Sequence, residues 1–328
     1  MRRLSFLILL LPTYLFCAEP LKLELVSAER IWNEAPHNAF TSLVRFKDRW
    51  FCSFREGKAH VSPDGAMRIL TSADGKTWES AALLNSETAD LRDPKLCVSP
   101  QGQLIVSAVA ALHKPVGYTH RSMLWRSDDG RTWSEPLEIG DPNYWLWRIN
   151  WRGNEAFSVG YDCAKLADTR LFRSTDGQRF EQWVVPFVSG GAPNEASLVF
   201  RRDDSCVCLL RRDGKPVGLV GTAKPPYKEW EWKELSKYVG GPHMISFPGE
   251  PADRLVAAVR LIDGKHRTAL CAIDADTGKV TELLTLPSGG DCSYPGIVWH
   301  DNQLWVSYYS SHEGKTSIYL ARAKVVDK

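Results

Sequence analysis

Charge of one sign, long apolar runs and helical periodicity are all scarce in this chain of 328 residues. Its 41 Lys and Arg residues nearly balance its 39 Asp and Glu residues, which leaves a net charge of +2 and no field that would draw nucleic acid or an anionic membrane. Beyond residue 18 no apolar stretch is long enough for a membrane-spanning helix. No CxxC pair or His/Cys spacing indicates zinc. These absences argue against a nucleic-acid binder, a membrane-spanning protein and a zinc-stabilised fold.

The N-terminus carries the pattern of a secretory signal peptide. Two arginines follow the initial Met and precede a short apolar run that ends at Ala18. A positive start, a short apolar centre and a small residue at the cut are typical of such a segment. We predict that residues 1–18 are removed and that residues 19–328 form one exported domain, secreted or periplasmic. A lipid anchor at Cys17 is the alternative, although the residues before it lack the small side chain that lipidation favours.

Cysteine is present, but not in the pattern of a disulfide framework. Of eight cysteines, seven remain once Cys17 is removed, and an odd number argues against complete pairing. Most lie in apolar, strand-like runs, where a free thiol acts as a small hydrophobic side chain. These are Cys52, Cys97, Cys206, Cys208 and Cys271.

Strand–turn–strand units recur at intervals of about fifty residues, the period of propeller blades. Each unit has β-branched or aromatic runs on both sides of a polar turn, which is the hairpin signal. The six units are TSLVRF/WFCSF, KLCVS/QLIVSA, WRINW/EAFSVGY, ASLVF/CVCLLR, MISF/LVAAVR and PGIVW/QLWVSYY. The sequence therefore predicts an all-β fold, a six-bladed β-propeller, with a long β-sandwich as the alternative.

The last repeat runs out near Lys328 before a fourth strand is complete. We predict that residues 21–27 supply this strand by pairing with residues 318–323. Such pairing would close the ring of blades and remove exposed sheet edges.

A second motif overlies the repeat. It reads SADGKTW at residues 72–78, SDDGRTW at residues 127–133 and, in decayed form, STDGQRF at residues 174–180. Asp and Gly favour a turn, beneath which the aromatic residue is expected to pack. Calcium binding is the alternative, but the turns lack the alternating oxygen ligands of a calcium loop. The motif resembles the Asp-boxes of the sialidase superfamily, and this resemblance implies a six-bladed propeller.

One rim of the propeller is expected to collect the reactive side chains, because a hairpin's first strand starts where its second strand ends. First-strand starts supply His37-Asn38, Arg92-Asp93, Trp147-Arg148, Asn194-Glu195, Pro242-His243 and Ser293-Tyr294, and second-strand ends supply Arg55, Tyr161, Arg211, Arg260 and Tyr309. Arg55, Arg211 and Arg260 occupy equivalent places, and converging guanidinium groups favour a carboxylate or phosphate ligand. The alternative is that each arginine pairs with a local acid, as Arg92 would with Asp93.

Tyr294 lies in GDCSYPG, near Asp291, and is expected to face Glu195 at this rim. A glutamate can take the phenol proton and make the oxygen a nucleophile. Because a phenol ionises only at a pH of about 10, it needs both a nearby base and cationic arginines. Most glycosidases use a carboxylate nucleophile, whereas sialidases use tyrosine. The reason is electrostatic, since the carboxylate on the anomeric carbon of sialic acid repels an anionic nucleophile.

The same residues carry a resemblance to the sialidase family that covers nearly the whole mature chain. Glu195 in NEASLVF and Arg211 in LLRRD resemble the family's glutamate and its second carboxylate-binding arginine. Arg260 in LVAAVR resembles the third arginine, and Tyr294 in DCSYPG resembles the nucleophile. The resemblance implies an exo-α-sialidase that releases terminal sialic acid with retention and needs neither a metal nor a redox cofactor.

The first blade departs from the family pattern. Where the family has Arg-Ile-Pro the chain reads HNAFTSL, with Asn38 at the place of the first arginine. Arg55, at the other end of the same hairpin, is expected to supply that charge. The family's general acid is an Asp on the following loop, which here reads REGKAHVSPDG. His60 and Asp64 are the two candidates for the proton donor, whereas Glu56 is expected to pair with Arg55.

Further substrate contacts are expected from Arg92, Asp93 and Glu313. Glu313 follows the last inner hairpin, where it would orient the nucleophile or bind a hydroxyl, with a surface salt bridge as the alternative. In NYWLWRINW the alternating part is expected in the core, with only Trp145 or Trp147 exposed as a sugar-stacking surface.

The sequence thus predicts an exported sialidase that acts as a monomer on sialylated glycans or other acidic saccharides. Two alternatives stay open. A non-catalytic glycan-binding propeller would keep an anion site without turnover, and the missing first arginine favours it. A glycosidase for another acidic sugar, such as a uronic acid, would use the same arginines.

Overall fold

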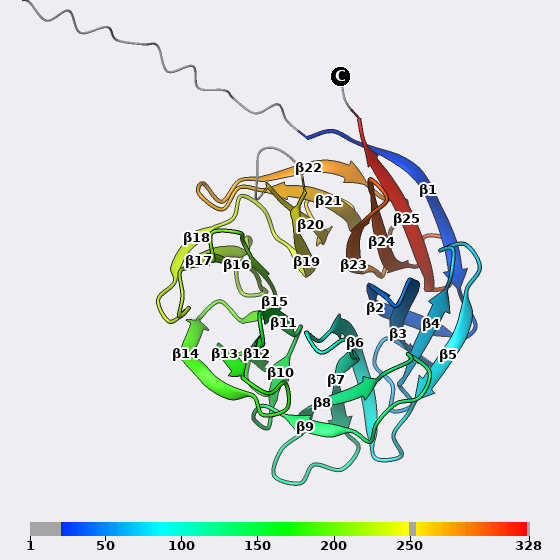
Figure 1. Cartoon of the computed structure of the whole chain (residues 1–328), viewed down its shortest axis with the longest axis horizontal. Helices are drawn as coiled ribbons and strands as arrows, with labels where there is room; N and C mark the ends of the chain where they lie inside the picture. Colours follow the sequence, from blue (N-terminus) through cyan, green and yellow to red (C-terminus); the bar gives the residue numbers. More distant parts are fainter. Residues whose placement is uncertain (1–20, 249–253, 327–328) are drawn as a thin grey trace, which may run out of the picture.

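The computed structural model describes residues 21–248 and 254–326. The secondary structure of these residues consists of 25 β-strands, which form six sheets arranged around one axis (Figure 1). The prediction of a six-bladed β-propeller is confirmed. No helix in these residues is long and apolar enough to cross a membrane. The predicted signal peptide, residues 1–18, lies outside the described residues.

Each blade is an antiparallel sheet whose first strand lies nearest the axis in Figure 1. Blade 1 consists of β2 (His37–Phe46), β3 (Arg49–Gly57), β4 (Ala66–Ser72) and β5 (Glu79–Leu84). Blade 2 consists of β6 (Ala89–Val98), β7 (Leu104–Leu112), β8 (His120–Ser127) and β9 (Leu137–Ile139). Blade 3 consists of β10 (Tyr144–Leu146), β11 (Asn150–Arg152), β12 (Glu155–Asp162), β13 (Asp168–Ser174) and β14 (Glu181–Ser189). Blade 4 consists of β15 (Pro193–Phe200), β16 (Cys206–Arg212), β17 (Leu219–Ala223) and β18 (Glu231–Glu234). Blade 5 consists of β19 (Gly240–Phe247), β20 (Arg254–Leu261), β21 (Arg267–Ile273) and β22 (Val280–Thr285). Blade 6 consists of β23 (Cys292–His300), β24 (Gln303–Ser310), β25 (Ser317–Val325) and β1 (Leu23–Trp32).

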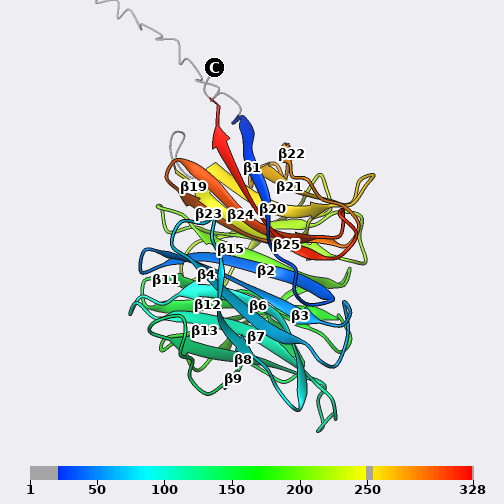
Figure 2. The ribbon, with the colours of Figure 1, turned by 90° about the vertical axis from the view of Figure 1, so that its right-hand side faces the viewer.

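The two ends of the chain close the ring in blade 6. β1 pairs antiparallel with β25, from Leu23 opposite Val325 to Trp32 opposite Ile318. Figure 2 shows the two strands side by side. The predicted closure is confirmed, although the N-terminal strand runs further than residues 21–27. Because the outermost strand comes from the opposite end of the chain, the ring cannot open without breaking this ladder.

The apolar core lies between the blades rather than within one layer. The innermost strand β2 is buried along most of its length, whereas the outermost β5 is exposed or half-buried. Along β20, Ala257 packs toward blade 4 and the next residue, Ala258, packs toward blade 6. Strands that are covered on both faces need apolar residues at successive positions, which explains runs such as LVAAVR.

The cysteines belong to this core. All seven cysteines in the described residues are free thiols, most of them buried, with Cys97 and Cys163 half-buried. Burial raises the pKa of the Cys52 and Cys271 thiols to about 12. They are therefore protonated and unreactive near neutral pH.

The three Ser-x-Asp-Gly turns are held by hydrogen bonds to the aspartate. In the first turn Asp74 Oδ1 accepts the backbone N–H groups of Lys76 and Thr77 at 2.8 and 2.9 Å. The other two turns repeat these aspartate contacts. The aromatic residue packs against the core as predicted. Trp78 is half-buried and donates its Nε1–H to the Gly75 carbonyl at 3.2 Å, and Phe180 of the third turn is 6% exposed.

Five of the six innermost strands carry an irregularity at the same level. The ladder shifts register between Ala39 and Ser42 in β2, Arg92 and Lys95 in β6, Pro193 and Ala196 in β15, Gly240 and His243 in β19, and Ser293 and Gly296 in β23. In blade 3 the first strand is instead divided into β10 and β11. A bulge redirects the side chains next to it, and we refer to this ring of irregularities as the bulge level.

Candidate functional site

Tyr294 and Glu195 form a short hydrogen bond at the bulge level. Tyr294 of β23 donates its phenol O–H to Glu195 Oε1 of β15 at 2.6 Å. Arg211 of β16 contacts both groups, since its Nη1 donates to Tyr294 Oη at 2.8 Å and lies 2.7 Å from Glu195 Oε2. The structure thus brings together three residues that the sequence analysis assigned to one site.

Arg260 of β20 completes this group. Its guanidinium carbon lies 4.8 Å from the centre of the Tyr294 ring. Its Nε donates to the Cys292 carbonyl at 2.8 Å, and its Nη2 donates to the Tyr309 phenol at 3.0 Å. Arg260 therefore joins blade 5 to blade 6 and places a second cation beside Tyr294.

The surrounding charges act on Tyr294 in opposite directions. Burial, and then the negative charge of Glu195, raise the pKa of Tyr294 well above its ordinary value, whereas Arg211 and Arg260 act to lower it. The phenol is therefore protonated and hydrogen-bonded to Glu195.

The backbone of blade 5 fixes Glu195 from a third direction. The N–H of Gly241 donates to Glu195 Oε2 at 2.8 Å. Gly241 has a φ of +55°, and a Cβ at this position would come within 2.8 Å of Tyr294 Cγ, so a side chain here would be both strained and obstructed. Tyr294 itself has a φ of 48°, which is uncommon for a residue other than glycine. The bulges thus hold the pair in an irregular backbone of the kind found at functional sites.

Two buried cations bind carbonyl groups at the bulge level. Lys95 of β6 donates to the Thr41 carbonyl of blade 1 at 3.3 Å. Arg148, between β10 and β11, donates to the Pro242 carbonyl at 3.3 Å and the Pro295 carbonyl at 2.7 Å, in blades 5 and 6. The sequence analysis gave neither residue a role. The available signal was a cation next to an apolar residue near the start of a hairpin, Lys95 before Leu96 and Arg148 before Ile149.

The structure corrects the prediction for Arg55. Its side chain is fully buried (0%), and its Nε lies 2.8 Å from Asp90 Oδ1. Its Nη1 donates to the Ala59 carbonyl at 2.9 Å and its Nη2 to the Ser62 carbonyl at 2.8 Å. Arg55 fastens its own loop to blade 2 and does not replace the missing first arginine. Asn38 does not replace it either, because its amide donates to two backbone carbonyl groups.

The two candidates for the proton donor have different surroundings. His60 Nδ1 lies 2.8 Å from Asp291 Oδ2, and the His60 ring packs edge-on against Phe40 with centroids 5.0 Å apart. Phe40 in turn lies 5.1 Å from the Tyr294 ring. Asp64 is exposed, and although burial opposes it, hydrogen bonds from its own loop hold its pKa below the ordinary value. Among the described residues, no hydrogen bond or ion pair joins Asp64 to the Tyr294 group.

Arg92 and Asp93 of β6 flank the same region. The guanidinium carbon of Arg92 lies 5.7 Å from the centre of the Trp145 ring, and its Nη2 donates to the His60 carbonyl at 3.4 Å. Asp93 is buried, and its Oδ1 has no hydrogen-bond partner in the described residues. Burial raises the pKa of Asp93, while the nearby Lys95 acts to lower it.

Glu313 and Glu56 contact other residues than the sequence analysis predicted. Glu313 lies 3.3 Å from Arg30 and accepts the Tyr319 phenol O–H at 2.8 Å. These contacts correspond to the surface salt bridge that was the alternative for this residue. Glu56 pairs with Arg68 at 2.9 Å instead of with Arg55.

Neither Trp145 nor Trp147 offers an exposed stacking surface, which corrects that prediction. Trp145 is 6% exposed and stacks on Tyr161 with ring centroids 5.6 Å apart. Trp147 is 1% exposed and meets the Tyr294 ring edge-on at 5.7 Å. Both indoles are covered because they pack against the buried tyrosines of the site.

Two acidic residues near the arginines were not predicted as site residues. Asp213 binds Arg211 at two points, with Nε to Oδ1 at 2.7 Å and Nη2 to Oδ2 at 2.8 Å. Asp291 Oδ1 lies 3.9 Å from Arg260 Nη2. The signal for both was local, since Asp213 comes two residues after Arg211 and Asp291 three residues before Tyr294.

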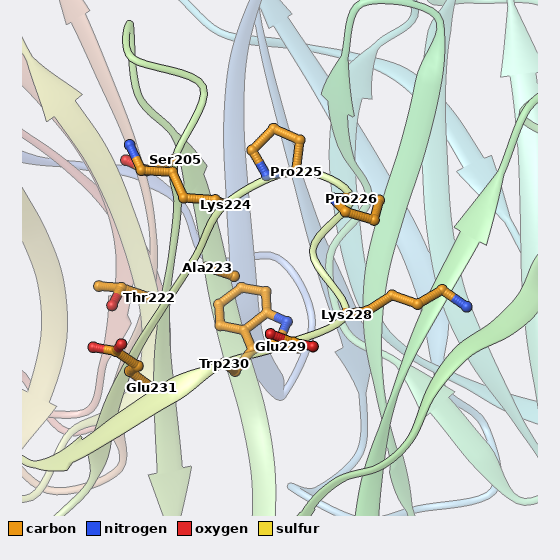
Figure 3. A pocket seen from close by; sticks show the side chains of 10 residues that line it. All are labelled: Ser205, Thr222, Ala223, Lys224, Pro225, Pro226, Lys228, Glu229, Trp230 and Glu231. Carbon is orange, nitrogen blue, oxygen red and sulfur yellow. The ribbon is translucent and has the colours of Figure 1, made fainter.

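A pocket of about 710 Å³ lies apart from these residues, against the outer part of blade 4 (Figure 3). Ten residues line it, among them Lys224, Lys228 and Trp230. No predicted site residue is among them. Trp230 is fixed there by its Nε1–H, which donates to the Tyr227 carbonyl at 2.9 Å.

No protein-family model and no curated protein matches the chain. Solved structures do match it. The chain is similar to a protein of unknown function from Dyadobacter fermentans, with a TM-score of 0.80 and 19% identity over 93% of this chain and 99% of that one. It is also similar to the GH93 α-L-arabinofuranosidase of Fusarium graminearum in complex with arabinobiose, with a TM-score of 0.70 and 13% identity over 91% of this chain and 97% of that one.

A third similar structure is Trypanosoma rangeli sialidase, with a TM-score of 0.69 and 13% identity over 88% of this chain. The match covers 55% of the sialidase chain, so the present chain corresponds to about half of that protein. The TM-scores show a shared fold, and at identities of 13–19% they show no more. At the level of the fold, the resemblance to the sialidase superfamily is confirmed.

Proposed function

We propose that this propeller is a retaining glycoside hydrolase in which Tyr294 is the nucleophile and Glu195 is its base. The observation that carries the proposal is the 2.6 Å hydrogen bond from the phenol to the carboxylate. A nucleophile in contact with a base, with a guanidinium on both, is the arrangement expected for covalent catalysis. The fold supports the same reaction class, since an arabinofuranosidase and a sialidase share it.

The reaction has two balanced halves. In the first, Tyr294 Oη bonds to the anomeric carbon as the phenol proton passes to Glu195. The glycosidic C–O bond breaks, and the leaving oxygen keeps its electron pair and takes a proton from the proton donor of the site. Arg211, 2.8 Å from the phenol oxygen, stabilises the charge that develops there. In the second, water attacks the anomeric carbon and gives a proton back to the proton donor, the bond to Tyr294 breaks, and Glu195 returns its proton to the phenol oxygen. Two inversions give net retention.

An exo-α-sialidase acting on sialylated glycans is the first substrate class we propose. A protonated phenol avoids the repulsion that an anionic nucleophile would meet beside the carboxylate of sialic acid. Arg211 and Arg260 supply two cations at the nucleophile. Their positions favour an anionic substrate group next to the reacting carbon.

A neutral glycoside is the second class, and a specific set of contacts favours it. Asp213 occupies Nε and Nη2 of Arg211, and Asp291 lies 3.9 Å from Arg260. Arg55, the third expected cation, is already bound in a buried ion pair with Asp90. A substrate carboxylate would therefore have to displace one internal carboxylate or lie beside the other, and like charges at such distances repel.

The test compares hydrolysis of a 4-methylumbelliferyl α-sialoside and a 4-nitrophenyl α-L-arabinofuranoside by the parent and by Tyr294→Phe. We expect kcat/KM to fall by at least about 10³-fold on whichever substrate the parent hydrolyses, because the covalent route is closed. Folding should change little, since Glu195 and Arg211 remain paired. Tyr308→Phe is the matched control, because its buried phenol donates to the Pro287 carbonyl at 2.9 Å in the same blade.

Parental turnover by a folded Tyr294→Phe protein would contradict this mechanism. A parent that binds sialic acid or arabinose in a calorimeter without hydrolysing either glycoside would instead indicate the glycan-binding propeller. Thermal melts of every variant separate loss of the fold from loss of turnover.

A further inference from the structure

Asp291 receives three hydrogen bonds from three separate segments of the chain. His37 Nε2 of β2 lies 3.0 Å and His60 Nδ1 of the β3–β4 loop 2.8 Å from Oδ2, and the Tyr309 phenol of β24 donates to Oδ1 at 2.7 Å. Although burial opposes it, these hydrogen bonds hold the pKa of Asp291 far below its ordinary value. Asp291 is therefore an anion whose orientation is fixed from three sides.

This anion determines the tautomer of His60. A carboxylate only accepts hydrogen bonds, so the proton shared with Asp291 is carried on Nδ1. The other nitrogen, Nε2, receives no hydrogen bond within residues 21–248 and 254–326. The side chain is 48% exposed. His60 thus has one nitrogen tied to the protein and one that can exchange a proton with a ligand.

His60 also lies on the side of the nucleophile. Its ring and the ring of Tyr294 both pack edge-on against Phe40, with centroids 5.0 and 5.1 Å away. The backbone of His60 is held by Arg92, which donates to its carbonyl at 3.4 Å. The other candidate, Asp64, lacks both features, since it is exposed and tied to its own loop.

We propose that His60 is the proton donor to the leaving group and that Asp291 is the residue that positions it, an assignment that rests on the proposed glycosidase function. In the first half-reaction the proton on Nε2 of the imidazolium moves to the glycosidic oxygen, which keeps the electron pair of the breaking C–O bond. In the second, neutral His60 takes the proton of the attacking water as the oxygen bonds to the anomeric carbon. His60 ends in its starting state, so the cycle balances.

The same three side chains also have the composition of a metal site. His37 Nε2, His60 Nδ1 and a carboxylate oxygen of Asp291 all lie within 4.8 Å of one another, and two imidazoles with a carboxylate suit zinc. Two observations favour the proton network. Each ring nitrogen is at hydrogen-bond distance from the same oxygen, and Arg260 lies 3.9 Å from the carboxylate, where a divalent cation would be repelled.

The charged and titratable groups around His60 come from several blades. Asp291 of blade 6 and His37 of blade 1 contact it directly, with the two imidazole centroids 5.5 Å apart. From blade 2, Arg92 donates to the His60 carbonyl, and Asp93 interacts with His60 through its charge. A change in activity with pH would combine all of these groups, so the test relies on leaving-group chemistry instead.

The test uses two substrates of the sugar that the parent hydrolyses, a 4-nitrophenyl glycoside and a methyl glycoside. Only the poor methanol leaving group needs a proton. His60→Gln should therefore lose about 10²–10⁴-fold in kcat/KM on the methyl glycoside and less than about tenfold on the nitrophenyl glycoside. Asp291→Asn should show the same asymmetry to a smaller extent. His113→Gln is the matched control, because His113 contacts the same loop through the Pro63 carbonyl at 2.8 Å and should match the parent.

Each outcome decides between the two proposals. Equal losses on both substrates in His60→Gln, or parental activity on the methyl glycoside, would overturn the assignment while Tyr294→Phe still supports the glycosidase. Parental activity in Tyr294→Phe would instead overturn the glycosidase mechanism. Activity that is abolished by EDTA and restored by Zn²⁺ would replace the proton network with a metal centre. Nitrogen NMR supplies the structural readout, in which His60 should carry its proton on Nδ1 in the parent and lose that preference in Asp291→Asn.

Discussion

Arg55 and Arg260 occupy equivalent places in blades 1 and 5, yet one belongs to the core and the other to the site. Each pairs with the residue that precedes the bulge of the innermost strand, Ala39 for Arg55 and Gly240 for Arg260. The side chain of Arg55 is 0% exposed, and that of Arg260 is 16% exposed. Because the register is the same, the difference must come from the neighbouring groups.

The neighbours of Arg55 capture its guanidinium. Asp90 of the next blade lies 2.8 Å from its Nε, and two carbonyl groups of the following loop take its other nitrogens. Gly65 makes room for this ion pair, since a Cβ there would collide with both Arg55 Nε and Asp90 Oδ1. Among the residues that the structure describes, no carboxylate lies as close to Arg260. Strand register thus sets the backbone position of each arginine, and an acidic residue on the adjacent blade determines where its guanidinium group lies.

The largest expected effect on stability comes from removing the core arginine. Arg55→Met would break the closer ion pair of Asp90, whose side chain is 7% exposed, and leave it with Arg92 at 3.7 Å, which costs about 3 kcal/mol of unfolding free energy. Arg260→Met should cost about 1–2 kcal/mol, because it removes two partly buried hydrogen bonds and leaves no buried carboxylate without a partner, while turnover falls sharply. Urea unfolding together with glycoside hydrolysis checks both. Equal stability losses at the two positions would contradict the comparison.

A smaller effect on stability is expected from a substitution in the backbone next to Tyr294, at Gly241. Gly241→Ala places a methyl group within 2.8 Å of Tyr294 Cγ at a φ of +55°. We expect a loss of about 1–3 kcal/mol from backbone strain and a loss of at least about tenfold in kcat, because the Tyr294–Glu195 hydrogen bond must shift.

Gly102→Ala is the matched control for this prediction. Gly102 has a φ of +76°, and no neighbouring atom lies within 4 Å of the place that a methyl group would take, so its substitution adds backbone strain without displacing a side chain. Unfolding and hydrolysis measured for both variants separate strain from contact. The same loss of turnover in Gly102→Ala would show that Gly241 acts through global stability alone.

Spacing was enough to predict the blades, because a strand–turn–strand unit of about fifty residues has few other ways to bury its apolar faces. It was also enough to bring Tyr294, Glu195 and Arg211 to one level. The partners of individual side chains were not predictable in this way. The contacts of Arg55 with Asp90 and of His60 with Asp291 join different blades. The contact of His60, like those of Arg55 with two loop carbonyl groups, also depends on the path of the loop between β3 and β4. Periodicity carries no information about that path.

The smallest effect is expected at the edge of blade 1 opposite the site, where Ser72 at the end of β4 pairs with Trp50. There the backbone N–H groups of Thr77 and Lys76 lower the pKa of Asp74 to about 2. The ordinary value is about 3.9, so folding favours the ionised form. This stabilisation is complete above a pH of about 4 and is lost as the pH falls toward about 2.

Asp74→Asn tests this contribution, because the amide keeps an acceptor oxygen but removes the titrating charge. The variant should be less stable than the parent at neutral pH, and the difference in urea midpoint should shrink as the pH is lowered through 4 toward 2, where the parent's carboxylate also becomes neutral. At pH 7 the folded variant should hydrolyse the glycoside at the rate of the parent, since the hydrogen bonds of Asp74 stay within its own turn. A midpoint difference that stays constant from pH 7 to 3 would mean that the turn is held by its shape and not by the charge of Asp74.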